Sequence, residues 1–318
     1  MSLTLDAAPA GLNQFAVTKA PMIQAKLRQG LEFENLMTPR SADRVYSAPN
    51  ATSGDLVQPY QWQFTPNNAD EISAEELYLR KIKLDIQMTA DDLEKFWDSY
   101  MVEWHEIGKD PIEWSFPRYM YEQVYLPKIL EEMNKNAWSG TYSAPTPGSA
   151  GLSVNSVDGY KKKIEDAVTA GDLTEYATGA LVESTMVSQI ESWIDSLPIP
   201  YRDAQGSIYM SPTNAKKYYR NYRSEFGYGA GVDNNANTEL RVEMTNKRIV
   251  PINAMEGSNR ILFFPATTNN MIWVTRRNYP TYFQIRWEKD ERVIKGLAEI
   301  YRAYGFEFLD HLFVNDQA

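Results

Sequence analysis

The chain has 318 residues, with 42 Asp and Glu against 32 Lys and Arg, a net charge of −10, two His and no Cys. The lack of Cys excludes disulfides, thiolate metal sites, iron–sulfur clusters and a cysteine nucleophile, and two His leave few bases for a Ser-His-Asp triad. An acidic chain is a poor general binder of duplex DNA, and no apolar run approaches the eighteen residues of a membrane span.

Residues 1 to about 50 show no sustained apolar period and are interrupted by four prolines. Five basic and four acidic residues make this stretch nearly neutral, and its start has no basic run followed by an apolar one, so no secretory signal is expected. The segment is interpreted as an irregular arm. Composition leaves open whether it is a frayed terminus or lies across a neighbouring subunit.

A hairpin is predicted next. Tyr60, Trp62 and Phe64 alternate with polar residues, which predicts a strand that the segment 66–70 ends. Residues 77–88 alternate again. The apolar face of this second strand would carry Ile82, Leu84, Ile86 and Met88, and the polar face Lys81, Lys83, Asp85 and Gln87. Two such strands are marginal alone and must pack on something.

Two helices follow the hairpin. Thr89 and Asp92 resemble a capping box before an apolar stripe that runs to residue 104. A longer helix is expected over 116–140, with Gly140 as its end. Pro127 lies inside this helix and should bend or split it.

The stretch 143–151, SAPTPGSAG, is the clearest linker and the expected domain crossing. Beyond it we expect a helix that Ser156 caps, and a helix over 181–197 with Val182, Met186, Ile190, Trp193 and Leu197 inward. A strand at 207–210 leads to Ser211 as the cap of a third helix. The rest reads mainly as strands: 247–254, 259–264, 270–276, 282–288 and 291–303.

The search for chemistry finds no catalytic constellation. Glu103, Glu106 and Glu113 cluster near His105, but a solvated helix end explains them better than an acid/base set. The glycine-rich loop 227–231 lacks the strand–glycine–helix order that binds phosphate, and 233–239 lacks the spacing of a calcium loop. His311 is interpreted as a packed core residue.

We therefore expect no cofactor and no metal. A long arm and a projecting hairpin are costly to order in a monomer, so the sequence favours a subunit of an assembly.

The order of elements resembles the major capsid protein of tailed bacteriophages, which has the Hong Kong 97-type fold. Residues 116–140 look like the spine helix of that family, and 207–223 look like its axial strand, Ser-Pro and helix. Residues 247–264 look like the strand–turn–strand element that follows. The resemblance implies an α+β fold with these parts: an N-terminal arm (1–45), an E-loop hairpin (46–89), a peripheral domain (90–140 and 277–318) and an axial domain (141–276).

The resemblance implies a structural protein, not an enzyme, that assembles with itself as pentamers and hexamers into an icosahedral head enclosing double-stranded DNA. Weak non-specific contact with the packaged DNA, separate scaffolding and portal proteins and a possible decoration protein are the implied partners, with no membrane contact. No charged helical segment precedes the arm, and the chain begins with Met1, so separate scaffolding is expected. The protein would be made in the host bacterial cytoplasm and reside in the virion.

The implied contacts between subunits are Tyr60, Trp62, Phe64, Lys81 and Lys83 in the E-loop and Arg28, Arg40 and Arg44 in the arm. Some members of the family link an E-loop Lys to a neighbour's Asn. This chain has no Lys between Lys26 and Lys81, so no such isopeptide bond is expected. Two alternatives stay open: an encapsulin-like compartment that holds a cargo enzyme, and a carbohydrate-active enzyme that uses paired acids and an aromatic surface.

Overall fold

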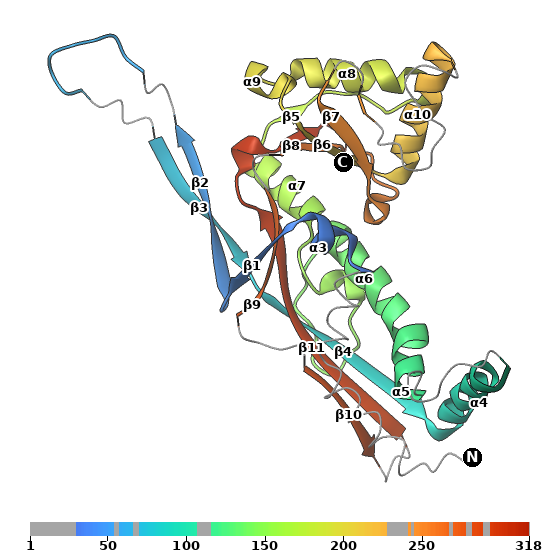
Figure 1. The fold of residues 1–318 in the computed structure, drawn as a ribbon. Coiled ribbons are helices and arrows are strands. Elements are labelled where there is room, and N and C mark those ends of the chain that lie inside the picture. The colour runs from blue at the N-terminus through green and yellow to red at the C-terminus, as the bar shows by residue number, and fades with distance from the viewer. Residues whose placement is uncertain are drawn as a thin grey trace.

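The computed structural model describes residues 30–53, 57–65, 70–106, 116–227, 241–242, 245–266, 270–277, 282–288 and 293–317. Within these residues the fold is α+β. Figure 1 shows a long sheet with a helix along it, a two-stranded hairpin that projects from one end of this sheet, and a second group of strands and helices beside the same end.

The long sheet is organised around β11 (Val293–Phe306). This strand pairs antiparallel with β4 (Arg80–Thr89), β10 (Tyr282–Glu288) and β9 (Met271–Arg276), and β1 (Thr38–Ala42) adds a parallel edge to β9. The alternation predicted for the second hairpin strand is confirmed in β4, whose even-numbered side chains from residue 82 to 88 are half-buried or buried while the odd ones are exposed. The apolar face of β4 lies toward the spine helix, because Leu84 packs with Met133.

The hairpin consists of β2 (Val45–Ser53) and β3 (Asp70–Tyr78). These strands, β1 and the short helix α3 (Glu32–Leu36) show that the interpretation of residues 30–50 as irregular was wrong. Local periodicity missed them because β1 and β2 form by pairing with distant strands, and Pro39 is tolerated on the edge strand β1.

Helix α4 (Ala90–Glu106) begins with the predicted capping box. The Thr89 hydroxyl accepts a hydrogen bond from the Asp92 N–H at 3.3 Å and donates to the Asp92 carboxylate at 2.7 Å. This hydrogen bond from Thr89 lowers the pKa of Asp92. The buried ring of Tyr100 then lies 5.8 Å from that of Tyr119, which fixes α4 against the start of the spine.

The predicted spine helix is split as expected. It runs through α5 (Phe116–Tyr119), a π-helical stretch η1 (Met120–Tyr125) and α6 (Leu126–Ser139). Pro127 stands in the first turn of α6, directly after the π-helical stretch, so the irregular part of the helix precedes the proline. The wider π turn before it removes the clash that a proline ring makes inside a continuous α-helix.

Gly140 ends α6 as predicted, but with φ −61°, so a left-handed cap is not the reason. A Cβ on Gly140 would lie 2.3 Å from the Val157 carbonyl oxygen, and a Cβ on Gly159 would meet three carbonyls of the last α6 turn at 2.6–2.8 Å. Gly159 is the N-cap of α7 (Tyr160–Ala170), so the prediction that Ser156 caps this helix was wrong. The Ser156 hydroxyl instead donates to the Ser153 carbonyl.

We expect Gly159→Ala to lower the free energy of unfolding by at least about 2 kcal/mol, because the new methyl group meets backbone oxygens that cannot turn aside. Chemical denaturation of the soluble subunit measures this. Gly151→Ala is the matched control, since a Cβ there meets nothing within 4 Å. Equal stability of the two variants would contradict the close approach of α6 and α7.

The second sheet has the order β5 (Glu175–Tyr176), β12 (Phe313–Asn315), β8 (Leu262–Pro265), β6 (Gly206–Met210) and β7 (Lys247–Pro251). Helices α8 (Met186–Ser196), α9 (Ile199–Arg202) and α10 (Pro212–Phe226) accompany it. The described residues also contain four 3₁₀ turns: η2 (Ser153–Asn155), η3 (Glu183–Thr185), η4 (Asn253–Met255) and η5 (Leu309–His311).

The start of α10 is the predicted one, because the Ser211 hydroxyl accepts from the Asn214 N–H at 3.3 Å. Within α8 the predicted inward face is also confirmed: Met186, Ile190 and Trp193 are fully buried. Val182 was placed wrongly, since it precedes the helix and is about half exposed.

The two faces of the second sheet belong to different apolar clusters. Tyr160 and Ile164 of α7 pack in one cluster with Trp138 of the spine and Leu262 of β8. The apolar cluster on the other face has Leu181 as its first member in chain order. The loop that follows the spine helix turns back on itself, because the Thr141 N–H donates a hydrogen bond to the Val154 carbonyl at 2.9 Å. As a result α7 packs beside α6. The division of the chain into peripheral and axial domains at residue 141 stays a prediction.

Candidate functional site: the projecting hairpin

The hairpin is a continuous antiparallel ladder that extends from the body of the protein. Its register runs from Val45 opposite Tyr78 to Ser53 opposite Asp70. Nine residues at about 3.3 Å each give strands of roughly 30 Å. In Figure 1 the hairpin points away from β10 and from the second group of helices.

The tip presents aromatic side chains to solvent. Tyr60, Trp62 and Phe64 are 93%, 91% and 92% exposed. They lie in a loop between β2 and β3, so the prediction that they form a strand was wrong. Large apolar side chains gathered at an exposed tip are typical of an interaction surface, because a monomer gains nothing from exposing them.

The root of the hairpin is anchored by packing. Leu77 is buried, and it lies so close to Gly305 of β11 that a Cβ there would come within 2.6 Å of a Leu77 methyl group. Leu77 belongs to a cluster with Ile272 and Val274 of β9. These contacts fix the root of the hairpin against the long sheet.

Ion pairs reinforce the same root. Arg40 contacts the Glu307 carboxylate at 2.7 Å, and the Tyr46 hydroxyl donates to it at 3.3 Å. The hydrogen bond to Glu307 raises the pKa of Arg40, while burial raises the pKa of Tyr46. On the other strand Glu75 pairs with Lys163 of α7 at 3.0 Å.

The candidate contact residues lie in three different places. Lys81 and Lys83 are exposed on β4, beyond the hairpin, where Lys81 pairs with Glu299 at 2.7 Å and Lys83 with Asp85 at 2.5 Å. Arg40 is held by Glu307 within the chain, and Arg44 is exposed between β1 and β2. Arg28 lies outside the described residues.

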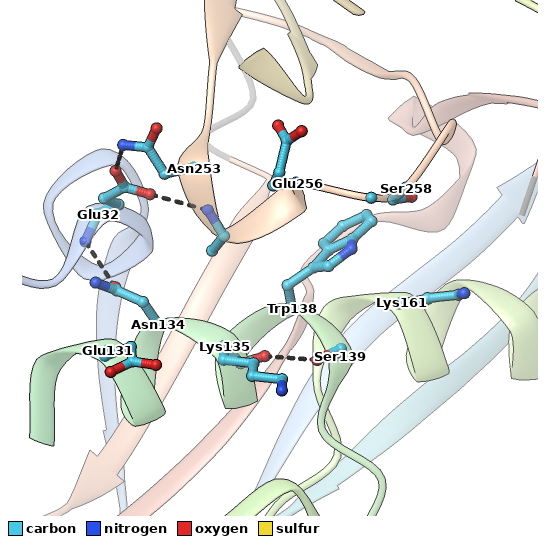
Figure 2. A pocket seen from close by; sticks show the side chains of 12 residues that line it. Glu32, Glu131, Asn134, Lys135, Trp138, Ser139, Lys161, Asn253, Glu256 and Ser258 are labelled. Atoms are coloured by element: carbon cyan, nitrogen blue, oxygen red, sulfur yellow. Dashed lines mark hydrogen bonds between the residues drawn. The ribbon is translucent and has the colours of Figure 1, made fainter. Parts of the chain in front are cut away.

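A polar crevice of about 490 Å³ separates the spine from η4 (Figure 2). The Glu32 carboxylate accepts hydrogen bonds from the Asn253 amide and the Ala254 N–H, and Asn134 binds the Glu32 N–H at 3.0 Å. The two other carboxylates are also held, Glu131 by Lys128 and Glu256 by Thr213. Each of the three acids thus has a hydrogen-bond or ion-pair partner within the chain.

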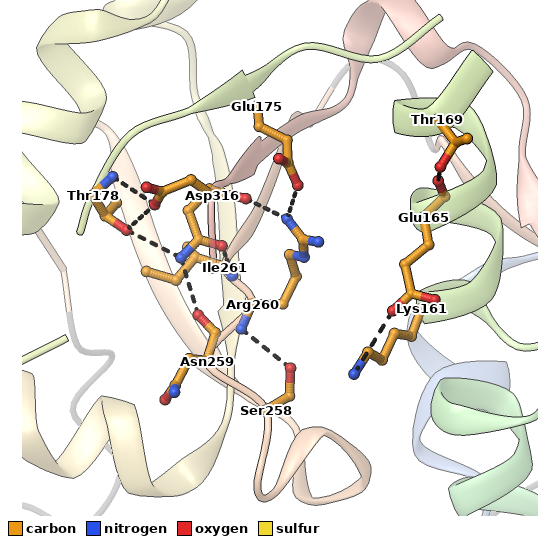
Figure 3. A network of polar contacts seen from close by, with 11 residues as sticks. Lys161, Glu165, Thr169, Glu175, Thr178, Ser258, Asn259, Arg260, Ile261 and Asp316 are labelled. Atoms are coloured by element: carbon orange, nitrogen blue, oxygen red, sulfur yellow. Dashed lines mark hydrogen bonds and ion pairs between the residues drawn. The ribbon is translucent and has the colours of Figure 1, made fainter. Parts of the chain in front are cut away.

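Several buried polar groups of the second sheet form a hydrogen-bond network with one another (Figure 3). The Arg260 guanidinium contacts Glu175 at 2.5 Å and donates to the Asn315 carbonyl. The Asn315 side chain accepts from the Ile261 N–H at 2.7 Å and donates to the Thr178 hydroxyl at 3.2 Å. This network fixes the last strand, β12, into the sheet.

The described residues contain no group of three His, Asp or Glu side chains placed to hold a metal ion. Among them, no helix combines the length and apolar character of a membrane span. The side chains near His105 and the loop 228–240 lie outside the described residues, so the interpretations of those segments stay predictions. His311 is half-buried, with its ring 6.0 Å from that of Tyr201 and 5.8 Å from that of Phe308, so it lies at the edge of the core and not inside it as the sequence suggested.

No protein-family model matches the chain, and no curated protein sequence matches it. Solved structures do. The satellite phage P4 procapsid including the size determination (Sid) protein matches at TM-score 0.59 and 9% identity, over 93% of this chain and 89% of that one. The capsid of the empty GTA particle matches at 0.57 and 13%, over 90% and 96%. The cyanophage A-1(L) capsid matches at 0.52 and 11%, over 91% and 92%.

These likenesses are of fold, and they extend over most of each chain. The fold is thus the one from which capsid shells are built. More narrowly, it is the Hong Kong 97-type fold of phage major capsid proteins, as the order of elements in the sequence predicted.

Proposed function

We propose that this protein is the major capsid protein of a tailed phage, which assembles with itself as pentamers and hexamers into an icosahedral head around double-stranded DNA. The observation that carries this proposal is the aromatic tip of the hairpin, with Tyr60, Trp62 and Phe64 each more than nine-tenths exposed on a capsid-type fold. Burial of such a side chain stabilises by about 1.5–3 kcal/mol. A neighbouring subunit supplies that burial.

The charge of the chain supports the same proposal. A shell must enclose DNA without gripping it over the whole inner wall, and a net charge of −10 disfavours tight binding of phosphates. Separate scaffolding and portal proteins and a decoration protein are proposed partners, and contact with the DNA is weak and non-specific. The protein would be made in the bacterial cytoplasm and reside in the virion.

In this proposal the arm, residues 1–45, lies on a neighbouring subunit, with Arg28 and Arg44 as contacts. Arg40 already binds Glu307 within the chain. Its proposed part is to hold the arm at the hairpin root. Lys81 and Lys83 are proposed contacts on β4.

The size of the particles that the purified chain forms tests the proposal directly. The purified chain should form shells of regular diameter, or rings of five and six subunits, in size-exclusion chromatography and negative-stain electron microscopy. A small oligomer at all concentrations would contradict it and favour an enzyme. The contents of shells isolated from the native cell separate a phage head from an encapsulin-like compartment: nuclease-protected DNA in the first case, folded protein cargo in the second.

We predict that the shell holds no isopeptide bond. The chain has neither Lys nor Arg between Arg44 and Arg80, so the hairpin and its tip lack an amine nucleophile. Boiled in detergent, mature particles should give a single band near 36.4 kDa. A ladder of covalent multimers on that gel would show that Lys81 or another lysine reaches a neighbour's amide.

A further inference from the structure

Helix α10 concentrates positive charge on a chain that is acidic as a whole. Its 15 residues include the cations Lys216, Lys217, Arg220 and Arg223 and one acid, Glu225. The whole chain has 42 acids against 32 cations, so the charge of α10 is opposite to that of the chain. Figure 1 shows α10 at the edge of the second group of helices, on the side away from the hairpin. A surface of this kind favours an anionic partner.

Three of these cations form one stripe along the helix. Lys216, Arg220 and Arg223 are spaced four and three residues apart, which places them on the same side of α10. Lys216 and Arg220 are exposed and Arg223 is half-buried. The Arg220 side chain keeps 64% exposure although it pairs with Glu183 at 3.2 Å. Seven residues of helix rise about 10 Å, so the three charges follow a nearly straight line of that length. We call these three residues the α10 stripe.

The helix that carries the stripe is held firmly against η3 and α8. The Asn221 side chain accepts a hydrogen bond from the Val187 N–H at 2.8 Å and donates to the Ser184 carbonyl at 3.0 Å. The Lys217 ammonium donates to the Leu181 carbonyl at 3.2 Å, so this fourth cation ties the helix to the segment before η3. The stripe therefore stands on a fixed backbone, and only its side chains need ordering when a partner binds.

An aromatic ring orders the last cation of the stripe. The Arg223 guanidinium lies over the Tyr219 ring, with its carbon atom 5.3 Å from the ring centroid. Stacking on a ring reduces the freedom of a guanidinium, so less entropy is lost when it contacts a phosphate. Arg223 is thus arranged for an oxyanion before any partner arrives.

We infer that the α10 stripe binds the phosphate backbone of duplex DNA. The inference rests on the proposed function and names the surface at which the shell meets its DNA. One strand of a duplex carries a phosphate about every 3.4 Å along the axis, so the length of the stripe corresponds to about three phosphates. Charges at such regular intervals match a straight stripe better than an acidic protein surface does, because the charges of a protein surface have no fixed spacing.

The neighbouring side chains make this contact weak and independent of sequence. The two amides of α10, Asn214 and Asn221, are 1% and 4% exposed, so they cannot reach the edges of bases. The adjacent helix α8 carries two acids, Glu191 and Asp195, and no cation. These acids repel phosphate and confine the contact to the stripe. A phosphate contact of this kind positions DNA without reading it.

The salt dependence of DNA binding tests the inference. Fluorescence anisotropy measures the binding of the full-length, unassembled chain to a labelled DNA duplex of arbitrary sequence. Three phosphate contacts predict a slope of about −2.7 for log affinity against log salt, which is a loss of about fortyfold between roughly 50 and 200 mM salt. Lys216→Gln, Arg220→Gln and Arg223→Gln together should bring the slope close to zero, and each alone should reduce it by about 0.9. A second duplex of unrelated sequence should give the same slopes.

The matched control combines Lys95→Gln, Lys128→Gln and Lys162→Gln, which removes the same charge from lysines that also pair with acids of the chain. Its slope should stay within about 0.5 of the wild-type slope, because these lysines lie outside the stripe. Thermal melting reports folding. If the triple variant of the stripe does not fold, the three single variants decide the question.

The outcomes separate the inference from the proposed function. A wild-type slope near zero, or equal slopes for the stripe variant and the control, would overturn the inference. A higher concentration needed for assembly, with unchanged DNA binding, would also overturn it and assign the stripe to an acidic protein surface. A wild-type chain that forms no shells would refute the proposed function, whereas the measured slopes would still decide whether the stripe binds DNA.

Discussion

Replacing Arg302 with Met should lower the free energy of unfolding of the subunit by about 3–5 kcal/mol, because it leaves a buried carboxylate without its counter-ion. The Arg302 and Glu34 side chains are 7% and 2% exposed, and Arg302 Nε lies 2.6 Å from a Glu34 oxygen. A second guanidinium nitrogen donates to the other Glu34 oxygen at 3.2 Å. This is a bidentate pair, in which both carboxylate oxygens are used.

The surroundings of this pair explain why the loss would be large. The guanidinium lies over the Trp273 ring at 4.9 Å, and the Trp273 indole N–H donates to the Glu34 carbonyl at 3.2 Å. Glu34 is in α3, Arg302 in β11 and Trp273 in β9. One ion pair thus fixes the end of the arm to two strands of the long sheet.

A double-mutant cycle with urea denaturation measures the effect. Glu34→Leu alone should cost as much as Arg302→Met alone, while the double substitution should cost less than either, because no charge is then left buried. Arg220→Met is the matched control: its pair with Glu183 is more than half exposed, and we expect less than about 1 kcal/mol. Single variants as stable as the control would show that water reaches the Glu34–Arg302 pair.

Structural features that depend on residues close together in the chain could be predicted from the sequence. The capping box at Thr89, the Ser211 cap and the split at Pro127 each depend on side chains within a few positions of the backbone that they control. The alternation of β4 was predicted for the same reason, since one face of the strand is covered along its whole length.

Features that depend on distant residues could not be predicted. Alternation at Tyr60, Trp62 and Phe64 looks like that of β4, but the tip residues have no strand opposite them, and a polar–aromatic pattern alone does not form a ladder. The strands at 38–53 show no such alternation, yet they form, because each pairs with a strand outside its own segment: β2 with residues 17 to 33 positions later and β1 with residues 234 positions later. The close approach at Gly159 belongs to the same class, since the carbonyl oxygens beside it come from the end of α6, more than twenty residues earlier.

For the candidate site, too, local features were predicted and features that depend on distant pairing were not. The sequence identified the aromatic residues that the structure exposes at the tip, because three large aromatic side chains in five residues are visible without coordinates. It assigned Lys81 and Lys83 to the hairpin, whereas they lie on β4, paired with β11. Only the pairing of β4 with a strand more than 200 residues later could have shown this.

Trp62→Ala should impair assembly strongly and leave folding unchanged, which is the sharpest test of the hairpin tip. The Trp62 side chain is 91% exposed in the single chain, so its removal takes away almost no packing within the subunit. At an interface, a central Trp anchor typically costs 2 kcal/mol or more on truncation. That is roughly a thirtyfold loss of affinity per contact, and every subunit of a shell makes the contact.

The measurement compares two quantities on the same protein. Thermal melting of the unassembled subunit should agree with wild type within about 1 °C, while the concentration at which particles form should rise by at least about tenfold. Trp62→Phe should recover part of the loss, because a ring is kept in the partner's pocket. Gln63→Ala, in the same loop, is the matched control for changes of loop flexibility.

The outcomes separate an interface from a structural role. If the melting temperature of Trp62→Ala falls as much as its assembly does, the ring supports the fold of the subunit and the tip is not a contact. If assembly proceeds at the wild-type concentration, the tip stays in solvent within the shell, and the subunits are joined elsewhere. If the concentration needed for assembly rises while the melting temperature stays unchanged, Trp62 lies between two copies. A neighbouring copy then buries the ring that the single chain leaves exposed.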